Sequence, residues 1–180
     1  NITNISDLIF DVDGLTTGAT VELIRNGTVV ATQTAVKSRV TMSDSPPSNA
    51  TYQYASREVI GSETSSLSES VSVTIDKLPP PVWIEQGPKQ IDPTVQTYCL
   101  FRLYYNEGIV GFETSDISFE GSTANLANVV VTHSNTPVSD SLRLDNVVGD
   151  NQILRASIPA GSVSDLAGNP NIFVSNVDNS

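Results

Sequence analysis

Three consecutive prolines, Pro79, Pro80 and Pro81, divide the chain into two parts of similar length. Each proline fixes its own φ angle, so three in a row make a stiff connection. A strand-like run that ends at Asp76 precedes them, and a new pattern of β-rich runs follows. We therefore expect two modules, residues 1–78 and 82–180, joined by a short, stiff proline linker at residues 79–81.

Both modules have the composition of β-sheet proteins. Ser, Thr, Asn, Val and Gly are abundant, charged residues make up 16% of the chain, and no amphipathic pattern of helical length occurs. The Asn26-Gly27 pair between two β-rich runs predicts a type I′ hairpin turn, because both residues tolerate positive φ. The strands predicted in the first module are residues 8–12, 20–25, 28–34, 39–42, 52–59 and 70–75.

The second module contains seven predicted strands separated by Gly, Pro, Asn and Asp turns. This number and spacing favour an immunoglobulin-like sandwich, so the predicted fold is all-β, with two tandem immunoglobulin-like β-sandwich domains. The first module shows six strands, and its opening strand either lies upstream of Asn1 or is replaced by residues 2–6. The strands predicted in the second module are residues 82–85, 97–105, 117–120, 128–132, 141–147, 153–158 and 172–177.

The run at residues 97–105 illustrates the expected strand pattern. Alternation places Cys99, Phe101, Leu103 and Tyr105 on one face and Arg102 on the other. Because Cys99 is the single cysteine, no internal disulfide can form. The sequence shows no recognisable histidine or basic partner for Cys99, so a buried, inert thiol is favoured over a nucleophile.

Charge and motifs exclude several function classes. The formal net charge is −11, from 20 acidic and nine basic residues, and a phosphate backbone would be repelled. No apolar run approaches the ~20 residues that a membrane-spanning helix needs. The chain shows no Ser-His-Asp ordering, zinc cluster or phosphate-binding loop, and lone His133 makes neither a zinc site nor a convincing catalytic base. We therefore expect a protein that is not an enzyme and binds no nucleic acid.

Four segments resemble the bacterial immunoglobulin-like (Big) tandem repeats of large surface adhesins. They are residues 11–30 and 71–76 in the first module and residues 111–118 and 158–169 in the second. The resemblance implies an extracellular protein of the bacterial cell surface, with neighbouring repeats of the same chain as its partners. It also implies calcium bound between modules in some members, through a linker Asp and an Asp-x-Ala-Gly-Asn loop. Asp165-Leu-Ala-Gly-Asn169 matches that loop.

Strand direction predicts where calcium ligands would meet. The loops at residues 106–111 and 162–171 should lie at the linker end of the second module. Their oxygen-bearing side chains would then face Asp76, and oxygen is the ligand that calcium prefers. The predicted metal ligands are Asp76, Glu107, Asp165 and Asn169, with Asp178 serving a following module. The alternative is that these are ordinary turn residues, whose side chains bond nearby backbone amides.

The function predicted from these patterns is a non-catalytic spacer pair of a bacterial cell-surface adhesin, active in cell adhesion, whose interdomain geometry calcium rigidifies. One alternative is a module that binds a carbohydrate, a host protein or another surface ligand through aromatic side chains; another is an accessory module of a secreted enzyme. For Trp83, a core or interface anchor is favoured over a sugar platform. Asp11 and Asp13 are weaker metal candidates, and we expect them to cap a strand and turn.

Overall fold

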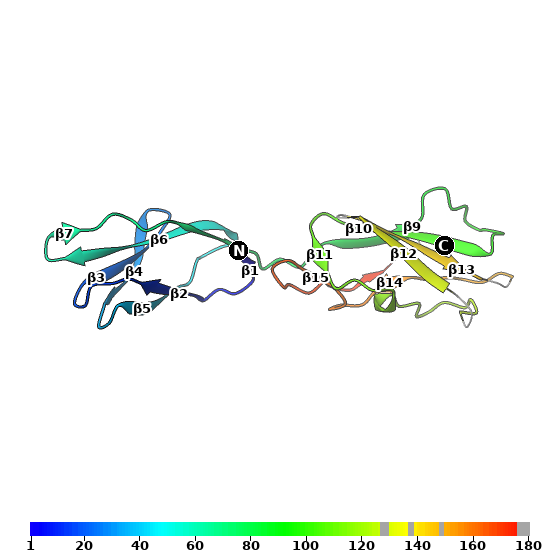
Figure 1. The fold of residues 1–180 in the computed structure, drawn as a ribbon. Helices are drawn as coiled ribbons and strands as arrows, with labels where there is room; N and C mark the ends of the chain where they lie inside the picture. Colours follow the sequence, from blue (N-terminus) through cyan, green and yellow to red (C-terminus); the bar gives the residue numbers. More distant parts are fainter. Residues whose placement is uncertain (127–129, 137–138, 148–149, 176–180) are drawn as a thin grey trace. The chain divides into compact units, whose positions relative to one another are not determined.

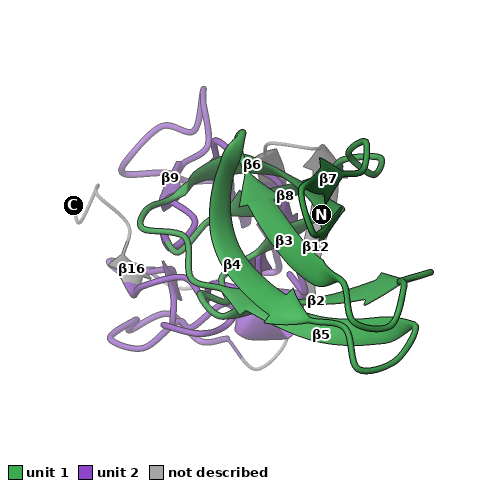
Figure 2. Ribbon diagram, turned by 90° about the vertical axis from the view of Figure 1, so that its left-hand side faces the viewer, with its two compact units in different colours: residues 1–77 green, residues 78–180 purple. Residues whose placement is uncertain are grey.

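The computed structural model describes residues 1–126, 130–136, 139–147 and 150–175 and is all-β, as predicted (Figure 1). The helical element in these residues is one 3₁₀ turn, η1 (Thr114–Asp116). The chain divides into two compact units, Asn1–Lys77 and Leu78–Ser180 (Figure 2). The proline linker therefore falls at the start of unit 2.

Unit 1 contains two β-sheets. The larger has the strand order β1-β8-β6-β3-β4, with β7 paired to the far end of β6. The smaller is an antiparallel pair of β2 and β5. The bounds are β1 (Ile2–Thr3), β2 (Leu8–Asp13), β3 (Thr20–Arg25), β4 (Thr28–Thr34), β5 (Arg39–Asp44), β6 (Ala50–Ile60), β7 (Glu63–Thr64) and β8 (Val71–Ile75).

All six strands predicted in the first module form, with small differences at their ends. The hairpin turn between β3 and β4 is also confirmed, because Asn26 and Gly27 have φ angles of 48° and 82°. Residues 2 and 3 form the short β1, which pairs in parallel with β8, Ile2 opposite Thr74. A short strand is thus present within residues 2–6, which is the segment predicted as a replacement for the opening strand.

The core of unit 1 draws side chains from both of its sheets. Alternating residues of β5 and of the first half of β6 are buried, and Phe10 on β2 meets Tyr54 on β6 with ring centroids 4.4 Å apart. With no disulfide available, burial of these apolar side chains holds the two sheets together. The buried cluster consists of Leu8, Val21, Leu23, Ala35, Val40, Met42, Tyr52, Tyr54, Val73 and Ile75.

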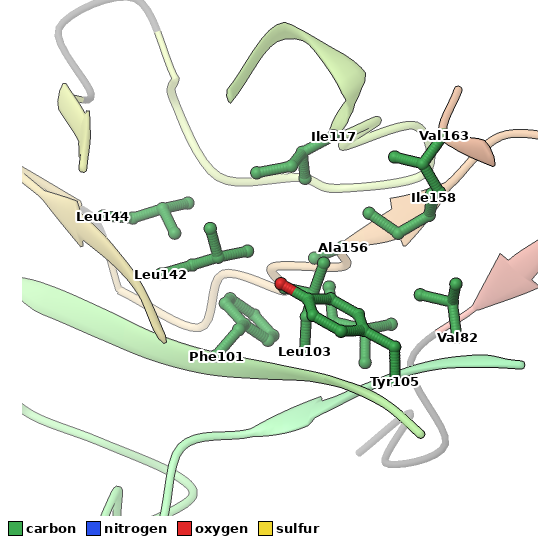
Figure 3. Close-up of a cluster of buried hydrophobic side chains, with 11 residues drawn as sticks. Val82, Phe101, Leu103, Tyr105, Ile117, Leu142, Leu144, Ala156, Ile158 and Val163 are labelled. Carbon is green, nitrogen blue, oxygen red and sulfur yellow. The ribbon is translucent and has the colours of Figure 1, made fainter. Parts of the chain in front are cut away.

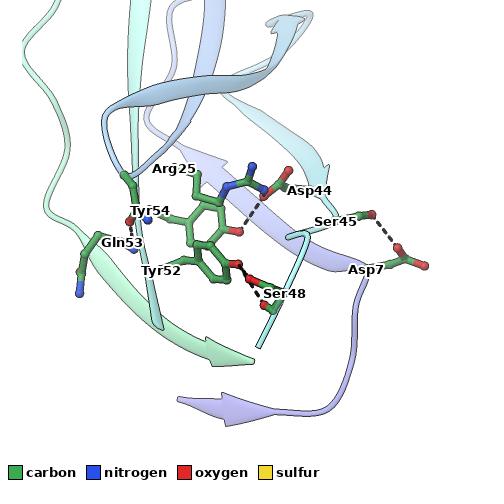
Figure 4. A network of polar contacts seen from close by, with 9 residues as sticks. Asp7, Arg25, Asp44, Ser45, Ser48, Tyr52, Gln53 and Tyr54 are labelled. Carbon is green, nitrogen blue, oxygen red and sulfur yellow. Dashed lines mark hydrogen bonds and ion pairs between the residues drawn. The ribbon is translucent and has the colours of Figure 1, made fainter. Parts of the chain in front are cut away.

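A polar network joins the same two sheets at their edge (Figure 4). Asp44 Oδ2 on β5 accepts hydrogen bonds from Arg25 Nη1 on β3 and from the Tyr54 hydroxyl on β6, both at 2.7 Å. Burial and the neighbouring Asp44 carboxylate raise the pKa of Tyr54. Burial alone would lower the pKa of Arg25, but the hydrogen bond and charge of Asp44 raise it. Each group thus keeps its bonding form at neutral pH.

Unit 2 has one four-stranded antiparallel sheet and two short pairs. The sheet has the order β12-β13-β10-β9, while β11 pairs with β15 and β14 with β16. The bounds are β9 (Val82–Gln86), β10 (Tyr98–Tyr105), β11 (Ile109–Val110), β12 (Val130–Thr136), β13 (Ser139–Asp145), β14 (Ser157–Ile158), β15 (Ser164–Asp165) and β16 (Val174–Ser175).

The core of unit 2 lies under the inner face of this sheet (Figure 3). Phe101, Leu103 and Tyr105 are buried along β10, which confirms the predicted alternation. Cys99 lies half-buried against the same core, and burial followed by the charge of Asp92 raises the pKa of its thiol. A raised pKa lowers the thiolate fraction, as expected of an inert cysteine. The opposite side of the core is formed by Ile117, Ala156, Ile158 and Val163.

The prediction of regular strands at residues 117–120 and 153–158 is wrong for most of their length. Ser118 forms an isolated bridge with Ser157, and η1 precedes it. The carbonyl of Ile153 accepts bonds from the amides of Thr123 and Ala124 instead of joining a ladder. Burial of Ile117 fixes the first segment without a ladder, and the second joins one only at β14, where Ile158 lies opposite Val174. The strand predicted at residues 172–177 is present in part, as β16, and its residues 176–177 lie outside the described part of the chain. Residues 128–129 of the strand predicted at 128–132 also lie outside it.

We predict that Tyr54→Phe lowers the free energy of unfolding by about 1–2 kcal/mol, because a half-buried carboxylate loses one donor. A raised pKa in the folded state means that the contribution of Tyr54 is full below pH 10.0, the ordinary value, and is lost at higher pH. Tyr54→Phe should therefore lose less stability than wild type between pH 8 and pH 11. Urea denaturation followed by circular dichroism measures both effects.

Tyr52→Phe is the matched control, since Tyr52 bonds to Ser48 and not to Asp44. It should keep the full alkaline loss of stability. Equal alkaline losses in Tyr54→Phe and wild type would contradict the role given to the Tyr54 hydroxyl.

Candidate functional site

Two loops of unit 2 meet at the short β11–β15 pair. Ile109 lies opposite Asp165, and Val110 lies opposite Ser164. Glu107 precedes β11 by two residues, so this pairing brings it to the end of β15. Carboxylate oxygens of Glu107 and Asp165 lie within 4.8 Å of each other. The structure thus joins the two loops that strand direction predicts as neighbours.

The loop that follows Asp165 wraps around its carboxylate. Oδ1 accepts the backbone amides of Ala167 at 2.8 Å and Asn169 at 2.9 Å, and Oδ2 accepts Nδ2 of Asn169 at 2.8 Å. Gly168 has a φ of 91°, a left-handed conformation that glycine adopts without a Cβ penalty. The Asp-Leu-Ala-Gly-Asn sequence therefore folds as one turn around a carboxylate that is only 2% exposed.

Asp165 remains ionised although it is buried. Burial alone would raise its pKa, but hydrogen bonds from Asn169, Ala167 and Gly168 outweigh that effect and hold the pKa below the ordinary value of 3.8. The loop amides thus stabilise a buried negative charge. Such a charge can bind a cation without first losing a proton.

The donor chemistry of this pair suits a hard cation. The carboxylate of Asp165 offers about four lone-pair positions, and Ala167, Gly168 and Asn169 all donate hydrogen bonds to it. A metal ion bound there would share or replace one of these hydrogen bonds. Glu107 supplies a second carboxylate, and calcium prefers such oxygen ligands.

Asp76 belongs to unit 1 and directly follows β8. Its backbone amide donates to the carbonyl of Thr3 at 2.9 Å. Along the chain it precedes Val82 by six residues, and Val82 pairs with Tyr105, two residues before Glu107. Within unit 2 the acidic pair is Glu107 and Asp165, and the role of Asp76 as a ligand beside them stays a prediction.

The other predicted ligands have different outcomes. Asn169 bonds to Asp165 through both its backbone and side-chain nitrogens, which shows an orienting role; its role as a ligand stays a prediction. Asp178 lies outside the described residues. Asp11 and Asp13 lie on β2, where Arg39 on β5 pairs with both, at 2.7 Å and 3.4 Å. That cross-strand pairing accounts for both acids without a metal.

Asn171 is a structural residue that sequence reasoning missed. It is 2% exposed, its Oδ1 accepts the amide of Val163 at 3.0 Å, and its Nδ2 donates to the carbonyls of Pro159 and Ile172. These bonds close the base of the Asp165 loop. The sequence shows Asn171 as a second asparagine directly after Asn169-Pro170. Asparagine is common in turns of every kind, so its presence there did not indicate a buried structural role.

An aromatic face lies on the outer side of the sheet of unit 2. Trp83 is 46% exposed, so of the two predicted roles the core anchor is wrong, whereas the interface anchor stays a prediction. Strand alternation buries Val82 and Ile84 and turns Trp83 outward. Trp83 lies opposite Tyr104 on β10, and Arg102 donates to the Tyr104 hydroxyl at 2.6 Å. The face therefore combines an indole, a phenol and a guanidinium.

The same outer face continues onto β13. The guanidinium carbon of Arg143 lies 4.1 Å from the ring centroid of Tyr98, a cation–π contact. Asp145 accepts two bonds from Nε of Arg143, both at 2.9 Å, and the charge of this arginine is thus compensated locally. The hydrogen bond and charge of Asp145 raise the pKa of Arg143.

A cavity of about 950 Å³ lies in unit 2 beside the loop between β9 and β10. Its wall contains four of the chain's six glutamines, namely Gln86, Gln90, Gln96 and Gln152. Amide groups both donate and accept hydrogen bonds. Trp83 is not among the lining residues, so the cavity and the aromatic face are separate features.

Comparison with known proteins gives no match, either to a protein-family model or to a curated protein sequence. The resemblance to Big repeats therefore rests on the sequence motifs.

In the described part of the chain, no helix has the length and apolar character needed to cross a membrane.

We predict that Asp165→Asn loses less stability than wild type when the pH falls from 7 to 2.5 in EDTA. A lowered pKa in the folded state means that the contribution of Asp165 is full above the unfolded value of 3.8 and is lost as pH falls towards the folded pKa. The thermal midpoint, measured at each pH, gives the comparison.

Asp150→Asn changes an exposed acid of the same unit and should follow the wild-type curve. If Asp165→Asn also follows that curve, the loop does not stabilise a buried carboxylate.

Proposed function

We propose that this chain is a non-catalytic spacer pair of a bacterial cell-surface adhesin, with calcium joining its two units. The observation that carries the proposal is the carboxylate pair of Glu107 and Asp165, held by the β11–β15 pairing. Asp76, fixed to the end of β8, supplies the third acid from the other unit. The ion would connect the last residues of unit 1 to the first loops of unit 2.

The strand pairing of unit 1 supports an immunoglobulin-like sandwich. Such domains place their second and fifth strands in one sheet, and their third, sixth and seventh strands in the other, with an extra strand beside the third in some members. The β2–β5 pair and the β8-β6-β3-β4 order fit this arrangement. Tyr52, near the start of β6, donates its hydroxyl to the carbonyl of Ser48 at 3.0 Å, as in the tyrosine corner of that fold. We propose the same class for unit 2.

Charge explains why the ion would stiffen the pair. Three carboxylates brought together repel one another, so without a cation the approach of Asp76 costs free energy. A divalent ion reverses the sign of this interaction and holds the linker against the loops. Because Pro79, Pro80 and Pro81 already restrict the linker, few degrees of freedom remain for the ion to fix.

The cellular setting follows from the resemblance to Big repeats. Tandem spacers of this kind hold a distal binding domain away from the cell, so we propose an extracellular location at the bacterial surface. Neighbouring repeats of the same chain are then the natural partners. An all-β chain with net charge −11 suits this role, because acidic surfaces favour solubility and attract cations.

Calorimetric titration of Ca²⁺ into the whole chain tests the proposal. We predict one site per chain, with a dissociation constant on the order of 10⁻⁴ to 10⁻³ M, as in other extracellular modules. Asp76→Asn, Glu107→Gln and Asp165→Asn should each weaken binding about tenfold, because each removes a charged ligand. Asp150→Asn is the control and should bind as wild type does.

Small-angle X-ray scattering in Ca²⁺ and in EDTA tests the stiffening. The wild type should become less flexible in Ca²⁺, whereas Asp76→Asn should not. Wild-type affinity in Asp76→Asn would show that unit 1 contributes no ligand, and the spacer proposal would lose its calcium link.

A second candidate function is binding of a carbohydrate or host protein by the aromatic face. The exposure of Trp83 beside Tyr104 and Arg102 favours it, because aromatic and arginine side chains are frequent anchors in binding surfaces. Trp83 is the single tryptophan, so its fluorescence reports on this face directly. We predict that any ligand found on a glycan array shifts this emission and that Trp83→Ala abolishes its binding. Array signals that persist in Trp83→Ala would place the binding elsewhere.

A further inference from the structure

Strand β4 forms one edge of the large sheet of unit 1. It contains seven residues and pairs with β3 on one side, at the end of the strand order. β5 lies near it but forms its own ladder with β2. Within unit 1, the outer side of β4 therefore has no strand partner. An edge of this length offers a row of backbone donors and acceptors for a further strand.

The hydrogen bonds next to β4 show which backbone groups point outward. Ala35 donates its amide to the carbonyl of Ala19 at 2.9 Å and accepts the amide of Gly18 at 2.7 Å, so both of its polar groups face the β3 side. In an antiparallel ladder, successive residues bond to opposite sides. Thr34 and Thr32 therefore direct their amides and carbonyls away from β3.

This edge lacks most of the usual protection against pairing. Residues 28–36 contain no charged side chain and no proline, and Val29 and Val36 are 39% and 74% exposed. The register shifts at the β3 residues Leu23 and Ile24, which bulges β4 near its start and leaves Ala31–Thr34 regular. In contrast, β2 and β5 carry Asp11, Asp13 and Arg39, and β1 and β7 have two residues each.

The absence of charge identifies the partner that this edge fits. A two-fold axis brings the residues at the centre of the paired segment close to their own copies, so a charged side chain there would meet the same charge. Two copies with net charge −11 repel each other over most of their surface. An uncharged strand avoids that local repulsion. We propose that β4 pairs antiparallel with β4 of a second copy of this chain, joining two unit-1 sheets side by side.

The proposed contact is weak and depends on salt in a definite direction. A single strand pair lies at the low end of interface size, so the dissociation constant should be on the order of 0.1–1 mM. Salt screens the long-range repulsion between the acidic copies. Raising NaCl should therefore strengthen the association, whereas an interface built from ion pairs would weaken.

Sedimentation velocity of the whole chain tests this inference, at protein concentrations from about 20 µM to about 1 mM, a range that includes the dissociation constant expected for so small an interface. The buffer contains EDTA, so that any dimer forms without calcium. The outcome of this experiment therefore does not affect the calcium proposal. Thr34→Lys places like charges across the axis, and Thr32→Pro removes an outward-facing donor, which edge strands tolerate. Thr64→Lys, at an exposed position of β7, is the matched control for added charge.

We expect wild type and Thr64→Lys to form dimers that increase with NaCl. Thr34→Lys and Thr32→Pro should reduce the association constant roughly tenfold or more, with thermal midpoints close to wild type. A wild type that stays monomeric throughout, or variants that associate as wild type does, would overturn the assignment of β4.

Discussion

The hydrogen bonds that satisfy the buried Asp165 carboxylate organise one end of unit 2. Three donors from Ala167 and Asn169 keep the group ionised in a position where water reaches it poorly. The same turn sets the end of β15, and β15 in turn holds the loop that carries Glu107. The hydrogen bonds that stabilise this buried charge therefore also place two carboxylates, Asp165 and Glu107, close together.

In unit 1, non-covalent contacts alone hold the two sheets together, because no disulfide is available. The Phe10–Tyr54 contact and the bonds from Arg25 and Tyr54 to Asp44 join strands of opposite sheets. Apolar burial supplies most of the driving force, and the polar bonds at the edge fix how the sheets align. A module of this kind can be repeated along a chain that has a single cysteine.

Sequence patterns predicted unit 1 better than unit 2. Alternating runs and the Asn26-Gly27 turn identified its strands, because these signals are local. In unit 2 the segments around Ile117 and Ile153 are held by tertiary contacts, which no local pattern encodes. The meeting of Glu107 with Asp165 was predictable from strand direction. The outward orientation of Trp83 was missed because a preference for burying aromatics was given more weight than the alternation of its own strand.

The central claim is that a divalent ion is shared between the end of β8 and the loops of unit 2. A crystal structure of the chain grown in Ca²⁺, with anomalous scattering data, tests it most directly. The account predicts an anomalous peak ~2.3–2.6 Å from carboxylate oxygens of Asp76, Glu107 and Asp165. Well-ordered side chains of these three residues with their oxygens turned apart, and no peak among them, would contradict it.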